Sequence, residues 1–144
     1  MTRTDIPASV TSKLQEARVA RLATADEKGQ PHLVPICYVF DGEVFYTAID
    51  AKPKRVEGKQ LARVRNIQVN PQVALLVDHY DEDWSRLWYI LVRGTAELLH
   101  HEDEKQKAMQ LLKAKYTNYR LGWLPEDALL IRVRPQQTTW WGNL

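Results

Sequence analysis

The residues best suited to chemistry are the cations between positions 52 and 65. Six Lys and Arg side chains stand there against the single carboxylate of Glu57, a local charge of +5 in a chain whose net charge is only +2. Phosphate groups suit such a cluster, because arginine offers a planar fork of donors and lysine a point charge to the same oxygens. The alternative is a solvated basic face, since charge runs commonly lie on the surface. The six cations are Lys52, Lys54, Arg55, Lys59, Arg63 and Arg65.

A helix through the end of this segment would gather polar side chains on one stripe. Lys59, Arg63 and Asn66 are spaced by four and three residues, which places them on the same face of a helix. Like charges four residues apart repel by a few tenths of a kcal/mol, so the arrangement is unfavourable unless an anion lies opposite. The spacing therefore favours a site for a phosphorylated ligand. A separate stripe is apolar: Leu61, Val64 and Ile67.

Other common catalytic patterns are missing from the sequence. The six glycines form neither of the standard nucleotide-phosphate loops, and the histidines lack the spacing of zinc ligands, so we expect no metal site. Cys37 lies in an apolar run and is expected to be a buried, unreactive side chain of the core. No residue is assigned as catalytic, and His79 and Tyr80 are named only as possible proton donors.

Length and composition restrict the classes of protein that the chain can be. Its 144 residues, 44% hydrophobic and 26% charged, predict a single globular domain spanning residues 1–144. The small net charge argues against a dedicated nucleic-acid binder, and a single cysteine excludes an intrachain disulfide. No apolar run approaches the roughly 20 residues that span a bilayer, and the first residues lack the apolar core of a signal peptide. We therefore expect a cytoplasmic protein without membrane contact.

The elements that must position the cations are mostly strands. Short turns separate the first three strand-like segments, which indicates an antiparallel meander rather than alternating strands and helices. The fold predicted is mainly β, a six-stranded antiparallel barrel, closed or partly closed, with flanking helices. A first helix would bury Val10 and Leu14, and a later one would cover 102–116. The expected strands cover 19–25, 33–40, 44–49, 73–80, 87–99 and 128–134.

Two residues within the expected strands carry positional meaning. Pro35 cannot donate to a ladder, so its strand should be an edge, or bulge where another group meets the backbone. A flat cofactor ring is one such group. Gly94 is expected to mark a bulge in the long strand 87–99. Several tryptophans late in the chain suit an oligomer interface or a ring-binding pocket, although core packing is the default for any one of them.

Five segments of the chain carry a family resemblance: 19–25, 29–36, 45–48, 63–67 and 70–75. Taken in order, they resemble the pyridoxamine 5′-phosphate oxidase-like superfamily of flavin- and deazaflavin-binding split barrels. Segments 48–55 and 77–88 look like the branch of probable coenzyme F420-dependent enzymes. The resemblance covers nearly the whole chain.

The resemblance implies a homodimer of six-stranded split barrels with two cofactor sites at the subunit interface. Relatives hold the cofactor phosphate near the positions of Arg63 and Asn66, with Lys54, Arg55 and Lys59 as additional anchors. Thr47 and Ala48 match the strand that faces phosphate and ring. The strand that lies along the ring matches Val34, Pro35 and Ile36, and the partner subunit's side of the pocket matches Trp88 and Trp140.

The function implied is hydride transfer from coenzyme F420, a deazaflavin, to a small organic substrate. Because one phosphate cluster serves several cofactors, an FMN-dependent oxidase or reductase is the first alternative. A non-catalytic cofactor carrier, or a module that binds haem or another tetrapyrrole, is an alternative of a different class.

Overall fold

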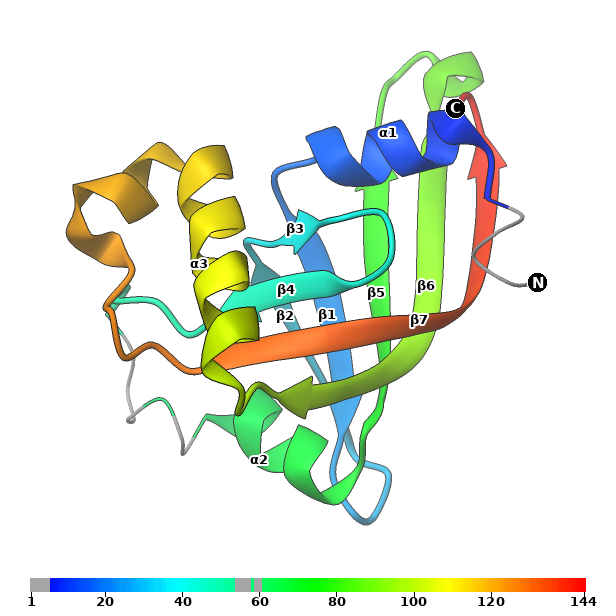
Figure 1. Ribbon diagram of the computed structural model, residues 1–144. Coiled ribbons are helices and arrows are strands. Elements are labelled where there is room, and N and C mark those ends of the chain that lie inside the picture. The colour runs from blue at the N-terminus through cyan, green and yellow to red at the C-terminus, as the bar shows by residue number, and fades with distance from the viewer. Residues whose placement is uncertain (1–5, 54–57, 59–60) are drawn as a thin grey trace.

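An antiparallel sheet of seven strands forms the body of the protein in the computed structural model, which describes residues 6–53, 58 and 61–144 (Figure 1). The strands lie side by side in the order β2-β1-β5-β6-β7-β4-β3. The described part of the chain also contains five helical segments, three of which are α-helices. The elements are α1 (Ala8–Glu16), β1 (Ala20–Ala25), β2 (Pro31–Ile36), β3 (Val39–Phe40), β4 (Phe45–Ala48), α2 (Ala62–Val69), β5 (Gln72–His79), η3 (Trp84–Arg86), β6 (Trp88–Leu98), α3 (Glu102–Lys115), η4 (Tyr119–Trp123) and β7 (Leu130–Gly142).

The order of the strands forces the sheet to curl. β2 and β3 are consecutive in the chain and only Cys37 and Tyr38 separate them, yet they form opposite edges of the sheet. The three Cα–Cα steps from Ile36 to Val39 span at most about 11 Å even when fully extended, so the two edges must approach each other. The result is a curled, mainly β half-barrel with flanking helices, as the sequence predicted, but with seven strands among the described residues instead of six.

The additional strand arises because the apolar run 33–40, predicted as one strand, is interrupted at Cys37 and Tyr38. The Tyr116 hydroxyl lies 3.0 Å from both the amide nitrogen and the carbonyl oxygen of Tyr38. Thr47 donates from Oγ1 to the Cys37 carbonyl at 2.7 Å. Side chains therefore satisfy the backbone groups that leave the ladder, which lets the chain pass from one edge of the sheet to the other.

The last strand is also longer than predicted. The expected segment 128–134 covers only its beginning, because β7 continues to Gly142 and pairs with β6 over the length of both strands. The added residues are rich in threonine and tryptophan, which favour strands. β7 pairs with β4 on its other side, so it joins the two halves of the sheet.

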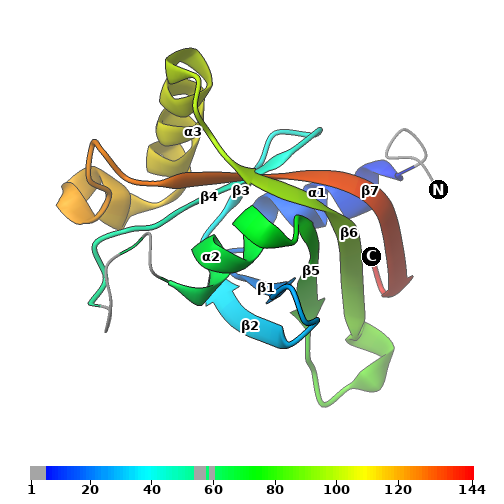
Figure 2. The same ribbon diagram turned by 90° about the horizontal axis from the view of Figure 1, so that it is seen from below.

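Two helices close the ends of the curled sheet. α1 lies across one end and buries Val10 and Leu14 against the sheet, and α2 lies across the other with Val64 and Ile67 buried (Figures 1 and 2). These four side chains belong to one hydrophobic core with the inward residues of the strands. No helix in the part of the chain that the structure describes is long and apolar enough to cross a membrane.

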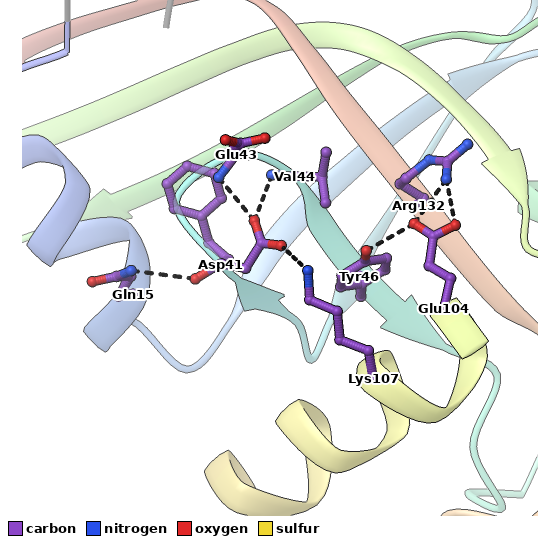
Figure 3. Close-up of polar contacts among 9 residues, drawn as sticks. Gln15, Asp41, Glu43, Val44, Tyr46, Glu104, Lys107 and Arg132 are labelled. Atoms are coloured by element: carbon purple, nitrogen blue, oxygen red, sulfur yellow. Dashed lines mark hydrogen bonds and ion pairs between the residues drawn. The ribbon is translucent and has the colours of Figure 1, made fainter. Parts of the chain in front are cut away.

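The third helix packs on the outside of the sheet, where polar contacts fix it to two strands. Arg132 of β7 donates to both carboxylate oxygens of Glu104 at 2.6 and 2.7 Å, and Tyr46 of β4 donates to the same carboxylate at 2.8 Å (Figure 3). Further along α3, Lys107 forms an ion pair with Asp41 at 3.0 Å. A second apolar core, with Met109 and Leu112 in it, lies beneath these contacts.

The predicted edge position of Pro35 and the predicted bulge at Gly94 are both confirmed. β2 is an edge of the sheet, so the missing N–H of Pro35 breaks no interior ladder. The register between β6 and β7 shifts between Arg93 and Gly94, which is the expected bulge. A Cβ atom at Gly94 would lie 2.1 Å from the Arg134 carbonyl oxygen, so the bulge requires glycine.

We expect Gly94→Ala to lower the free energy of unfolding by about 2 kcal/mol or more, because backbone must move to admit the methyl group. Urea denaturation measures the change. Gly122→Ala is the matched control: nothing lies within 4 Å of a Cβ there, so only the positive φ of 103° is penalised, at about 1 kcal/mol. Equal losses in the two variants would contradict a packing requirement at the bulge.

Candidate functional site

A cavity of about 380 Å³ opens where the ends of β2 and β4 meet the beginning of α2. It brings together six of the eleven residues predicted to bind a cofactor, although they come from three separate segments of the sequence. These six are Val34, Pro35, Ile36, Thr47, Ala48 and Arg63. The other lining residues are Val19, Cys37, Asp50, Lys52 and Pro53.

One wall of the cavity is apolar and comes from the end of β2. Val34 and Ile36 alternate with Pro35 along the free edge of the sheet, with no further strand beside them. Across the cavity, β4 contributes Thr47 and Ala48. Since the Thr47 hydroxyl is held by the Cys37 carbonyl, the two walls are fixed to each other by a 2.7 Å hydrogen bond. A flat, largely apolar ring system is the kind of group that fits between such walls.

The opposite wall carries a positive charge. Arg63, in the first turn of α2, lines the cavity, and its Nε atom is buried without a hydrogen-bond partner in the part of the chain described. Burial lowers the pKa of the guanidinium, and the attraction of Asp50 opposes this shift. A buried donor without a partner is costly, about 1–3 kcal/mol or more for a charged group. The cost would be recovered by an anion that accepts from Arg63.

Asp50 compensates this charge only in part, because its carboxylate already accepts other hydrogen bonds. Tyr119 donates to it at 2.6 Å, and the Lys52 ammonium forms a close ion pair with the same oxygen. Burial raises the pKa of Asp50, but the hydrogen bonds from Lys52 and Tyr119 outweigh it and hold the pKa below its ordinary value. The carboxylate is therefore ionised at neutral pH and orients Lys52 at the rim of the cavity.

Asn66, predicted on the same stripe as Arg63, faces a different direction. Its side-chain amide donates to Oγ1 of Thr24 in β1 at 3.0 Å, and both side chains are buried. This hydrogen bond attaches α2 to the sheet. Asn66 therefore sets the position of the helix that carries Arg63, and the lining of the cavity does not include it.

Trp88 lies away from the cavity, on the inward face of β6. It packs against the main core and stacks on His79 with a ring separation of 6.1 Å. The Lys13 ammonium lies over the face of its ring. Trp140 packs against the same core. The three remaining predicted anchors, Lys54, Arg55 and Lys59, lie outside the described residues.

Some lining residues were not predicted. Cys37, expected to be buried, is only half-buried because it lies in the break between β2 and β3. Val19 and Asp50 flank strands, and only the short spacing of Asp50 from Lys52 could have indicated a shared role. No three His, Cys, Asp or Glu residues within the described ranges come close enough to share a metal ion.

Comparison with known proteins identifies the family. Residues 6–142 match the model of the pyridoxamine 5′-phosphate oxidase family. The chain belongs to this family. Among curated protein sequences, none matches the chain. The family assignment agrees with the curled, mainly β sheet and its flanking helices.

Solved structures similar to this chain are described in terms of F420, FAD and haem. An F420 reductase is 26% identical, with a TM-score of 0.66 over 93% of this chain and 98% of that one. An FAD-binding protein from Mesorhizobium loti is 24% identical, with a TM-score of 0.67 over 94% of each chain. The haem storage protein HutZ from Vibrio cholerae is 18% identical, with a TM-score of 0.71 over 93% of this chain and 92% of that one.

We expect Asn66→Ala to lower the free energy of unfolding by about 1–2 kcal/mol, because the buried Thr24 hydroxyl loses its partner. Urea denaturation of Asn66→Ala, Thr24→Val and the double variant measures the coupling between the two residues. The double variant should be less destabilised than the sum of the single ones. Strictly additive losses would contradict a direct Asn66–Thr24 interaction.

Proposed function

We propose that this protein is a coenzyme F420-dependent oxidoreductase that transfers hydride to a small organic substrate. The observation that carries the proposal is the buried Nε atom of Arg63, which has no hydrogen-bond partner among the described residues and lies at one end of a cavity whose other wall is apolar. A phosphate fits the charged end and a deazaflavin ring fits the apolar wall. The F420 reductase supports this choice, since it is the relative with the highest identity among the structures compared above.

The chemistry of hydride transfer belongs to the cofactor, and the protein supplies binding and orientation. Arg63 would donate charge-assisted hydrogen bonds to the phosphate, with Lys52 nearby at the rim. Val34, Pro35 and Ile36 would lie along the ring and exclude water from one face. Thr47 keeps these walls at a fixed separation through its bond to Cys37.

The same cavity also suits the phosphate and ring of FMN, so a flavin-dependent oxidase or reductase is the second candidate. The FAD-binding relative favours it. The haem storage relative favours a carrier role instead. Haem iron commonly takes an axial histidine, but none of the described lining residues is a histidine, so the cavity favours a flavin or deazaflavin over haem.

We further propose that the protein is a homodimer whose cofactor sites lie at the subunit interface. Exposed apolar side chains lie at the cavity, where Val19 lines it, and on β2, β6 and β7, and a second copy could bury them. Light scattering of the purified chain should give twice the monomer mass of 16.7 kDa. A monomeric mass would contradict this part of the proposal. The exposed apolar residues are Val19, Leu33, Tyr89 and Trp141.

Titration of the purified protein with F420 and with FMN, followed by cofactor fluorescence, tests the proposed function. We expect F420 to bind with a dissociation constant in the micromolar range or below, and FMN to bind at least about ten-fold more weakly, a difference of about 1.4 kcal/mol. Tighter binding of FMN would favour the flavin-dependent alternative. Binding of haem in place of both would favour the carrier, and the absence of binding by F420 would overturn the proposal.

The variant Arg63→Gln tests the phosphate contact. Loss of a charge-assisted hydrogen bond should weaken cofactor binding by about ten-fold or more. The free energy of unfolding should be unchanged or higher, because the variant no longer buries a charge. Arg65→Gln, an exposed arginine on the same helix that does not line the cavity, is the control and should leave affinity unchanged. Equal affinities of Arg63→Gln and the original protein would assign Arg63 a role other than phosphate binding.

A further inference from the structure

A second cavity, also about 380 Å³, lies beside the first. It lies between the seam of the sheet, where the chain crosses from β2 to β3, and the segment after α3. The two cavities share Cys37 and Lys52, so ligands in the two would meet at these residues. Ala51 donates to the Trp123 carbonyl at 2.9 Å, which attaches the segment after α3 to the chain that leaves β4 (Figure 1). The remaining lining residues are Arg18, Tyr116, Thr117, Asn118, Tyr119 and Trp123.

The charge of the second cavity is positive. Its described lining includes the cations Arg18 and Lys52 and no carboxylate. The Asp50 carboxylate lines only the first cavity and holds Lys52 from that side. A ligand that enters the second cavity therefore meets the Arg18 cation beside the Lys52–Asp50 ion pair, and Arg18 favours an anionic group.

Arg18 is exposed to solvent, and two contacts within the chain orient its guanidinium. One of its terminal nitrogens donates to the carbonyl of Lys115, at the end of α3, and the guanidinium carbon lies 5.6 Å from the centre of the Tyr116 ring. These contacts fix the plane of the fork while its other N–H groups have no partner in the described part of the chain. A planar donor fork in a fixed position matches a carboxylate.

The two tyrosine hydroxyls of the cavity are already committed, so they leave recognition mainly to Arg18 and the aromatic faces. The Tyr116 hydroxyl lies 2.8 Å from the Arg18 carbonyl and 3.0 Å from the backbone of Tyr38, and the Tyr119 hydroxyl donates to Asp50. Trp123, whose side chain is 43% exposed, supplies an aromatic surface at the same opening. An aromatic face beside a guanidinium suits a flat organic acid.

We propose that this second cavity is the substrate subsite and that it selects planar organic acids, whose carboxylate pairs with Arg18 and whose ring packs on Trp123. Calling this ligand a substrate rests on the proposed function, in which the neighbouring cavity would hold the cofactor. The recognition itself depends only on residues of the second cavity. A carboxylate carried by the side chain of F420 is the other source of the same chemistry.

Binding of 2-naphthoate to the cofactor-free protein, compared with the neutral 2-naphthamide, tests the recognition by calorimetry. We expect the acid to bind about ten-fold or more tightly than the amide, as for a charge-assisted contact. Arg18→Gln should remove this preference, and Arg18→Lys should keep part of it. Arg21→Gln, an exposed arginine paired with Asp78 outside both cavities, is the matched control and should keep all of it. Equal affinities of acid and amide, or an unchanged preference in Arg18→Gln, would overturn the proposal.

Competition separates the two sources of the carboxylate. If the subsite takes a substrate, 2-naphthoate should bind equally well in the presence of saturating FMN or F420. Displacement by F420 alone would show that the carboxylates of the cofactor occupy the cavity, and displacement by FMN would place the probe in the first cavity. Either result overturns the substrate assignment. If neither cofactor binds but the Arg18-dependent preference is present, the proposed function fails while the anion site stands.

Discussion

The Tyr116 hydroxyl at the seam of the sheet is the contact on which the rest of the structure depends. It lies within 3.0 Å of both backbone groups of Tyr38, where the chain crosses from β2 to β3. Without a partner, the amide and carbonyl of a buried residue would each cost free energy comparable to a lost hydrogen bond. One side chain from the end of α3 therefore allows the strand to be interrupted inside the protein, and the curl of the sheet follows from that interruption. Both cavities lie against this seam, because Cys37 lines each of them.

Charge is distributed so that stability and binding oppose each other at Arg63. Arg63 is half-buried with its Nε atom fully enclosed, and its attraction to Asp50 is weakened because that carboxylate is shared with Lys52 and Tyr119. An incompletely paired charge of this kind lowers the stability of the folded protein when no ligand is bound. An anionic ligand would supply the missing partner, so the local instability is what makes the cavity selective for anions.

Sequence patterns predicted the features that depend on local chemistry. The edge position of Pro35, the bulge at Gly94 and the helix 102–116 follow from a missing N–H, a missing side chain and a regular apolar spacing, and all three are confirmed. The break in 33–40 was not predictable in this way, because its cause, Tyr116, lies 78 residues further along the chain. The helical stripe was informative only in part. Arg63 lines the cavity, whereas Asn66 three residues later binds Thr24, since side chains within one stripe still diverge according to the partners that the fold supplies.

The prolines of β2 have a consequence for how copies of the protein can associate. Pro31 and Pro35 lie four residues apart, at positions of the same parity on an edge strand, and neither has an N–H to offer a neighbouring strand. An edge with these gaps is a poor template for adding another strand, which protects it against runaway aggregation. A second copy would therefore have to dock through side chains on the face of the sheet rather than by extending it. The free edge stays open to small molecules, and continuous fibres built by strand addition at β2 are disfavoured.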